Sequence, residues 1–308
     1  AYSRGVLEKH LLWGSLRIVF AVPDHPWVDA ADGAAVRVAM TVACRSDAHS
    51  SKALLGSAGI GEESEVSFRE VDRIGSALQA VSVHEATVAL GANKGMSFQG
   101  VVPAGDGFKL DQADLQALGI DPIALPSCIR RYIIGRDLVQ RLESRFIIDF
   151  FGRSVTDARA ESPLLYQRLL DRVLPERTHN KRQSYREKWW IFAEPRPAMR
   201  IALAGLTRYI VTPYTAKFRP FVFVDGAILP DAMAYAIASD NPLLLGILSS
   251  LVHVTWAIAA GGTLEDRPRY NKSVCFEPFP FPPFDTPDST NLQSRIRTLA
   301  EHLDAHRK

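Results

Sequence analysis

The feature that most restricts the fold is an 18-residue stretch without a formal charge, Leu243–Ala260 (LLLGILSSLVHVTWAIAA). Such a stretch must leave water, either inside a protein core or in a membrane. A membrane-spanning helix needs roughly 20 apolar residues, but polar residues such as Ser249 and His253 interrupt this one, and no basic cluster flanks it. We therefore predict one continuous core helix, in which His253 is a hydrogen-bonded core residue and not a metal ligand.

Composition places the chain among ordinary folded proteins. It has 308 residues, of which 47% are hydrophobic and 23% charged, enough for one large domain or two smaller ones. Three widely separated cysteines, Cys44, Cys128 and Cys275, form no C-x-x-C pair, so we expect neither a disulfide framework nor a zinc site of that kind. They favour a reducing, cytoplasmic location. Because the chain begins at Ala1 and not at Met, we expect further motifs upstream.

The pattern of short strands and helices predicts an α+β (mixed α/β) fold. Leu16–Val22 and Ala35–Ala43 are rich in β-branched residues and could pair as an antiparallel hairpin at the edge of a larger sheet. Arg45–Glu65 is rich in Ser, Gly and Ala and predicts a loop. The prolines of Val274–Phe284 predict an extended segment. Other strands are expected at 145–150, 208–212 and 221–224, and helices at 111–119, 154–173, 196–206 and 291–306.

Charge is unevenly spread along the chain. The net charge is only +2, but residues 130–219 hold 19 basic and 9 acidic side chains, and residues 172–219 alone hold 11 and 3. A net charge of +8 over 48 residues attracts polyanions. This segregation favours a nucleic-acid partner over a basic face that is merely solvated.

Two basic segments are candidates for that contact. In Asn180–Phe192 (NKRQSYREKWWIF), cationic and hydrogen-bonding side chains precede the adjacent Trp189 and Trp190. We predict that the tryptophans pack into a core and hold the segment rigid while its charges face outward. Thr212–Arg219 (TPYTAKFR) follows a predicted strand and forms a second basic loop. Arg and Lys can grip phosphates or read guanine, and Asn and Gln can read adenine.

Motifs for complete enzymes are weak. The glycines at 56, 59 and 61 do not have the G-x-G-x-x-G spacing, and no P-loop, G-x-S-x-G or H-E-x-x-H is present. Phe281-Pro282-Pro283-Phe284 lacks the polar residue that amino-methyltransferases place before two prolines, so we predict a structural arm there. A metal-dependent nuclease using acids in the first 130 residues remains an alternative. A protein-interaction scaffold with a basic face is another.

Long motifs, in order, give the chain a more specific resemblance. It resembles the C-terminal part of adenine-N6 DNA methyltransferases of the combined restriction–modification type, the MmeI-like (type IIG/IIL) family. The resemblance covers nearly the whole chain. Its motifs are LRIVFAVPDHPW with AAVRVAMTV, GVVPAGDGF, RRYIIGRDL, RFIIDF, LPERTHNKR, REKWWIF, RYIVTP, GILSSLVHVTWA and PRYNKSVCFEPFPFP.

The resemblance implies a domain organisation. Residues 1–45 would be the last strands of the methyltransferase domain that binds S-adenosylmethionine, 46–285 the DNA target recognition domain and 286–308 a C-terminal helix. The family's cofactor-binding glycines and its N-P-P-aromatic loop would lie upstream, so no catalytic residue, cofactor site or metal site is expected here. The parent would flip an adenine out of the duplex and methylate it, with or without a nuclease.

The resemblance also implies partners and site residues. The expected partners are double-stranded DNA and the upstream methyltransferase domain of a bacterial enzyme, with no membrane involved. DNA specificity would come from the two basic segments. The residues expected to contact DNA are Arg136, Lys181, Arg182, Arg186, Tyr214, Lys217 and Arg219.

Overall fold

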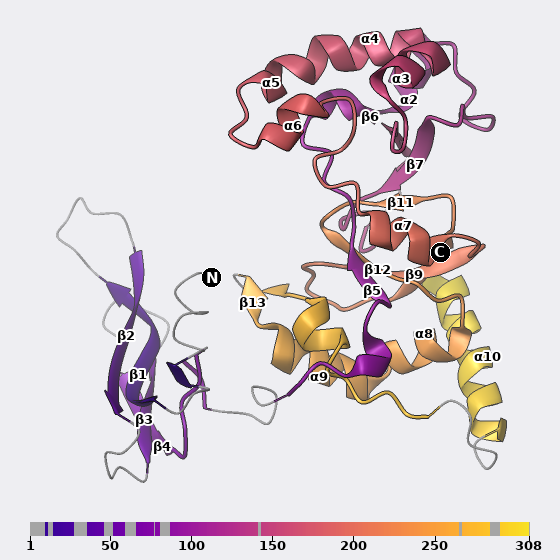
Figure 1. Ribbon diagram of the computed structural model, residues 1–308. Helices are drawn as coiled ribbons and strands as arrows, with labels where there is room; N and C mark the ends of the chain where they lie inside the picture. Colours follow the sequence, from indigo (N-terminus) through magenta and orange to yellow (C-terminus); the bar gives the residue numbers. More distant parts are fainter. Residues whose placement is uncertain are drawn as a thin grey trace. The chain divides into compact units, whose positions relative to one another are not determined.

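The computed structural model describes residues 10–11, 15–27, 36–45, 52–58, 66–76, 78–80, 87–140, 143–264, 267–283 and 290–307. Helices and several separate sheets alternate along the chain (Figure 1), which confirms the predicted mixed α/β class. The chain divides into two compact units, Ala1–Thr87 and Val88–Lys308.

The first unit holds a four-stranded sheet in the order β2-β1-β3-β4. The hairpin predicted from the sequence is present, because β1 (Leu16–Trp27) pairs antiparallel with β2 (Val36–Arg45). The loop predicted over 45–65 is wrong in part. Residues Ala53–Ala58 form β3, which lies parallel to β1 and antiparallel to β4 (Val66–Val71). A Cβ atom at position 56 would lie only 2.8 Å from the Val22 side chain, so glycine is needed there for β3 to pack closely. The small residues that had suggested a loop instead allow this close packing.

The compact unit extends beyond residue 45. Its small core joins residues of β1 and β3 to Ile74, and the buried members are Leu11, Ile18, Ala21, Ala53, Leu55 and Ile74. The predicted boundary at 45 thus falls inside this sheet. The assignment of residues 1–45 to a methyltransferase domain stays a prediction.

Two further four-stranded sheets form the second unit. One has the order β10-β9-β12-β5 and is antiparallel throughout. The other has the order β11-β7-β8-β6, with β11 parallel to β7. Their bounds are β5 (Ser97–Gln99), β6 (Lys109–Leu110), β7 (Ile129–Ile133), β8 (Arg145–Ile148), β9 (Arg208–Pro213), β10 (Val222–Asp225), β11 (Leu229–Pro230) and β12 (Ala234–Ile237), with a separate pair β13 (Thr263–Leu264) and β14 (Arg267–Pro268).

Side-chain caps start some of the helices of the second unit. Capping boxes start α2 (Gln112–Ala117) at Asp111 and α3 (Val155–Glu161) at Ser154. The single helix predicted over 154–173 is interrupted at Ser162, because Pro163 starts a new helix. The remaining helices are α4 (Pro163–Arg172), α5 (Leu174–Thr178), α6 (Gln183–Glu187), α7 (Pro197–Leu203), α8 (Pro242–Leu248), α9 (Leu251–Gly261) and α10 (Thr290–Arg307), with 3-10 turns η2 (Gly91–Asn93) and η3 (Asp106–Phe108).

The charge-free stretch is a core element but not one helix. It divides into α8 and α9, bent by 57°, because the Ser250 hydroxyl accepts a hydrogen bond from the His253 amide and starts a second helix. Four leucines of α8 are buried and α10 packs against it. His253 is fully buried, with Nε2 3.1 Å from the Tyr270 hydroxyl, while Nδ1 has no hydrogen-bond partner among the described residues. The predicted core position is confirmed, but only one of the two ring nitrogens is satisfied. Among the described helices, none alone has the length and apolarity to cross a bilayer, although the bent α8–α9 pair together reaches them.

The segment predicted as extended over 274–284 is only partly so. Its beginning belongs to a π-helical turn, η4 (Lys272–Phe276). The Asn271 side chain caps the start of this turn by accepting a hydrogen bond from the Ser273 amide. The turn is closed by the Glu277 amide, which donates to the Lys272 carbonyl oxygen at 2.7 Å directly before Pro278, the first proline of the segment.

Candidate nucleic-acid interface

The two adjacent tryptophans anchor the first basic segment. Trp189 is buried, and the Trp190 indole N–H donates to the carbonyl oxygen of Arg153 at 3.0 Å. The two rings meet edge to face, with centroids 6.2 Å apart. The predicted packing role of the pair is confirmed.

Arg177 is a second anchor of the same segment. Only 2% of its surface is exposed, and its guanidinium donates to the backbone oxygens of Ala104 at 3.1 Å, Ile191 at 2.8 Å, and Pro103. Burial lowers the pKa of Arg177 to about 10, so the group stays protonated at neutral pH. This arginine, although central to the basic run, is a clamp between two stretches of backbone.

The remaining cations of this segment face solvent. Lys181, Arg182, Arg186 and Lys188 are exposed on and around α6, and we call them the α6 surface. Arg182 donates to the Tyr185 hydroxyl at 2.7 Å and lies 3.5 Å from a Glu194 carboxylate oxygen. These contacts are at the surface, where an ion pair holds a side chain only weakly. Three residues predicted to contact DNA therefore lie together and accessible here.

The second basic segment corrects one prediction. Arg219, expected to contact DNA, is buried with 8% of its surface exposed. Its guanidinium donates to the carbonyl oxygen of Pro268 at 2.7 Å and to that of Pro213. Burial lowers its pKa to about 10. Like Arg177, it uses its donors on backbone carbonyl oxygens, so it supports the loop from within.

Tyr214 is half-buried at the base of the same loop. Its amide donates to the Met233 carbonyl oxygen and its carbonyl accepts from the Tyr270 amide, each at 2.7 Å. Its ring lies against Tyr235, with centroids 6.1 Å apart. Tyr214 therefore fixes the loop in position.

Arg136 and Lys217 line one groove, of about 690 Å³, which we call the cationic groove. They come from two loops far apart in the sequence, and both side chains are exposed. Two further cations line it, Lys109 from β6 and Arg267 from β14, opposed by one carboxylate, Asp231. The lining residues are Lys109, Ile134, Gly135, Arg136, Val139, Gln140, Thr215, Ala216, Lys217, Phe218, Asp231, Met233 and Arg267.

A short turn at Asp231–Met233 holds both sides of the groove. The Asp231 carboxylate accepts a hydrogen bond from the Tyr132 hydroxyl at 2.5 Å and another from the Met233 amide at 2.7 Å. Burial, together with the Asp231 carboxylate, raises the pKa of Tyr132 far above its usual range, so the hydroxyl remains a donor. A side chain at Gly135 would overlap the Met233 carbonyl oxygen, so only glycine lets that loop approach. The groove is consequently shaped before any ligand arrives.

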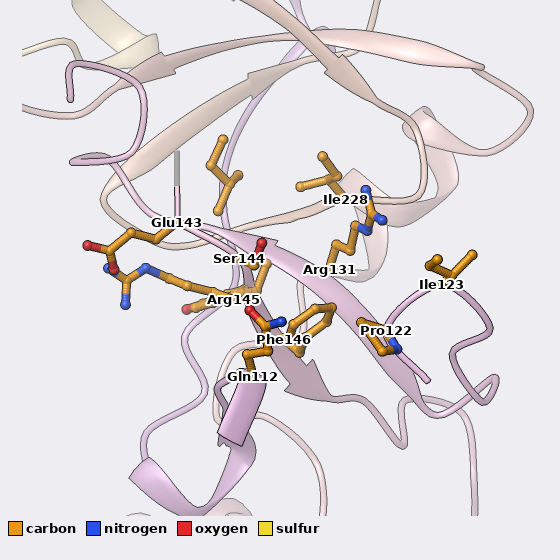
Figure 2. Close-up of a pocket in the computed structure, with 11 residues that line it drawn as sticks. Gln112, Pro122, Ile123, Arg131, Glu143, Ser144, Arg145, Phe146 and Ile228 are labelled. Atoms are coloured by element: carbon orange, nitrogen blue, oxygen red, sulfur yellow. The ribbon is translucent and has the colours of Figure 1, made fainter. Parts of the chain in front are cut away.

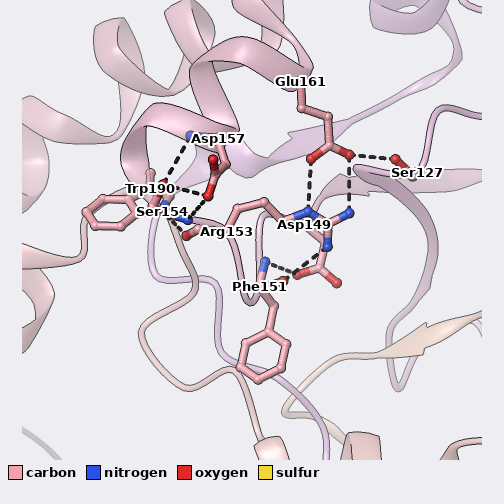
Figure 3. Close-up of polar contacts among 8 residues, drawn as sticks. All are labelled: Ser127, Asp149, Phe151, Arg153, Ser154, Asp157, Glu161 and Trp190. Atoms are coloured by element: carbon pink, nitrogen blue, oxygen red, sulfur yellow. Dashed lines mark hydrogen bonds and ion pairs between the residues drawn. The ribbon is translucent and has the colours of Figure 1, made fainter.

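Two other hollows in the second unit contain arginines that are already paired. In the smaller one, of about 270 Å³, Arg145 pairs with Glu143 beside Phe146 and Gln112 (Figure 2). The larger, of about 410 Å³, contains Arg153, which pairs with Glu161 at 2.9 Å (Figure 3). The hydrogen bond from Arg153 lowers the pKa of Glu161 and keeps it charged. Each of these hollows thus holds an arginine whose charge is balanced by a glutamate, as Asp106 balances Lys109 of the cationic groove at 2.8 Å.

Asp149 is a further paired group in the larger hollow. It accepts two hydrogen bonds from Arg200, at 2.7 and 3.1 Å, and one from the Phe151 amide. In the part of the chain that the structure describes, no three His, Cys, Asp or Glu side chains gather to hold a metal, so the nuclease alternative gains no ligand cluster.

Sequence reasoning missed Lys109 and Arg267. Lys109 lies in the two-residue strand β6 and Arg267 in the two-residue strand β14, and the pairing of β6 with β8 and of β13 with β14 positions their backbones. Lys109 directly follows the GVVPAGDGF motif and Arg267 directly precedes the PRY motif, but neither motif indicated that the neighbouring cation lines a groove.

Comparison with known proteins matches this architecture. Residues 77–283, more than half of the chain, match the family described as "MmeI, target recognition domain". The Type IIL restriction-modification enzyme MmeI, solved in complex with DNA, superposes with a TM-score of 0.71 over 97% of this chain at 22% identity. A 69-residue region is 34% identical to DNA methyltransferase A of Bacillus subtilis (strain 168), covering 22% of this chain and 8% of that protein.

The chain spans 39% of the length of the MmeI structure that it matches. At this level of identity the superposition establishes the fold, while the family match rests on the sequence itself. The chain belongs to the MmeI target recognition domain family.

Proposed function

We propose that this chain is the DNA target recognition module of a restriction–modification methyltransferase. Membership of the target recognition family supports this, as does the fold shared with an enzyme solved on DNA. The observation that carries the proposal is the cationic groove, in which exposed cations from separate loops face one hollow. The scaffold alternative has no comparable support.

The groove and the α6 surface would make different contacts. In the groove, Arg136 and Lys217 stand on loops fixed by buried groups, so they can hold phosphates or base edges in register. On the α6 surface, Lys181, Arg182 and Arg186 would supply additional phosphate contacts. Tyr214 and Arg219 would act indirectly, by holding the groove loop.

The activity of the whole protein is part of the proposal. The upstream portion would bind S-adenosylmethionine, flip an adenine and methylate its exocyclic amine, in the cytoplasm of a bacterium. The present chain would give that reaction its sequence preference. Whether the parent also cleaves DNA depends on segments outside this chain.

Binding to duplex DNA tests the proposal directly. The 308-residue chain should bind a random-sequence duplex at low salt, and the affinity should fall steeply as salt is added because phosphate contacts release counterions. Lys217→Glu should weaken this binding, whereas Lys94→Glu, at an exposed lysine outside the groove, should not. Equal binding of heparin and duplex, with no sequence preference after affinity selection, would favour the scaffold.

A further inference from the structure

Three large apolar side chains are exposed inside the cationic groove. Phe218 is 76% exposed, Val139 48% and Met233 45%, and all three line the same hollow. They come from three separate segments of the chain. Exposed apolar groups that gather in one place usually mark a contact surface.

The backbone holds this apolar patch open. The Tyr214 amide donates to the Met233 carbonyl oxygen at 2.7 Å, and Gly135 packs against that same oxygen. The loop that carries Phe218 and the loop that carries Val139 are therefore both fixed to Met233, the third residue of the patch. Because the loops cannot close over the patch, its apolar surface stays available to a ligand.

The cations around the patch indicate the kind of ligand. Lys109, Arg136 and Lys217 line the hollow that holds the apolar side chains, which suits a ligand with an anionic backbone and an apolar group between its charges. On the major-groove edges of the four bases, the one apolar group is the C5-methyl of thymine. A side chain that wedges between bases unstacks them and kinks the duplex, whereas a hollow lined by three apolar side chains can enclose a methyl group.

We propose that Phe218, with Val139 and Met233, forms a subsite for the C5-methyl group of a thymine in the recognised duplex. The proposal rests on the proposed function and adds a specificity-determining residue to it. Phe218 would cover the methyl group while Lys217, whose ammonium lies 5.7 Å from the Phe218 ring centroid, approaches the adjacent phosphate.

Deoxyuridine substitution tests the proposal, because it removes the methyl group and nothing else. The full chain is first used to select a preferred duplex from a random library, and each thymine of that duplex is then replaced singly by deoxyuridine. At one position we expect roughly four-fold weaker binding, the loss for one buried methyl group. Phe218→Ala should abolish this difference and Phe218→Leu should keep part of it.

Leu251→Ala provides the matched control, because Leu251 is 82% exposed on α9 and does not line the groove. It should preserve the thymine–deoxyuridine difference. The proposal is overturned if the selected duplex binds but no thymine is sensitive. It is also overturned if Phe218→Ala weakens thymine and deoxyuridine duplexes equally. Failure of the folded chain to bind any duplex at low salt would instead overturn the proposed function, and this subsite with it.

Discussion

The two basic segments of the second unit differ in the surroundings of their exposed cations, although a buried arginine anchors each: Arg177, three residues before the first segment, and Arg219, within the second. The guanidinium groups of Arg177 and Arg219 both donate hydrogen bonds to backbone carbonyl oxygens. Beyond Arg177, the exposed cations lie on and beside the five-residue helix α6 and line neither the cationic groove nor the two smaller hollows. Beyond Arg219, Lys217 lines a groove with cations from other loops. Positive charge alone therefore does not define the interface. The interface is defined where several segments are held together so that their cations line one groove.

The largest expected effect tests the claim that the buried arginines are clamps. Arg177→Met should reduce the free energy of unfolding by about 3 kcal/mol, because it removes the buried guanidinium that donates to the carbonyl oxygens of Ala104, Ile191 and Pro103. Lys181→Met, four residues away and exposed, should change it by less than about 0.5 kcal/mol. Urea denaturation of both variants measures the difference. Equal stability would mean that Arg177 does not clamp the segment.

Acid should distinguish the core beneath the groove loop from the α6 surface. Burial, with the nearby charge of Arg219, lowers the pKa of His253 to about 3, below the ordinary value near 6.5. The unfolded chain therefore takes up the proton first, and stability falls as the pH drops from about 6.5 toward 3. At pH 5 the loss should approach 2 kcal/mol relative to pH 7.

His253→Gln keeps a hydrogen-bonding partner for Tyr270 but does not titrate, so this variant isolates the histidine. Denaturation between pH 7 and pH 5 should show a shallower loss of stability than in the unmodified chain. The same slope in both proteins would show that other groups cause the acid sensitivity.

Charge reversal in the groove should weaken DNA binding more than reversal outside it. Lys217→Glu should raise the Kd for duplex DNA about ten-fold at low salt, since it replaces a phosphate attraction with a repulsion. The fold should be unaffected, because Lys217 is exposed. Fluorescence anisotropy with a labelled duplex measures the change, and Lys94→Glu serves as the control. An unchanged Kd would remove the groove from the interface.

The smallest effect is expected on the α6 surface. Lys181→Gln combined with Arg182→Gln should raise the Kd by only about three-fold, because these side chains have no rigid partner that orients them toward a ligand. The same anisotropy assay compares this pair with Lys217→Glu. A larger loss from the α6 pair than from Lys217 would reverse the assignment of the two regions.

Local patterns predicted much of the fold. The helices that begin near residues 111, 154 and 196 and the buried tryptophans were predicted from neighbouring residues. The break at Ser250 was not predicted, because whether a serine caps a new helix or bonds within the old one depends on packing against other segments.

The candidate site was less predictable for a related reason. Arg219 and Lys217 are two residues apart and chemically alike, yet one is buried and the other exposed. Which of them faces inward depends on Pro268, 49 positions away along the chain. Lys109 and Arg267 reach the groove only through strand pairing. Sequence identified the basic segments, and long-range contacts determined which of their cations remain accessible.

The salt dependence of duplex binding tests the central claim most directly. Each phosphate contact that is removed should reduce the slope of log Kd against log salt by about one. The account predicts that the double variant Arg136→Gln/Lys217→Gln has a slope about two smaller than that of the unmodified chain, while Lys94→Gln leaves it unchanged. A double variant that binds with the full original slope would contradict the account.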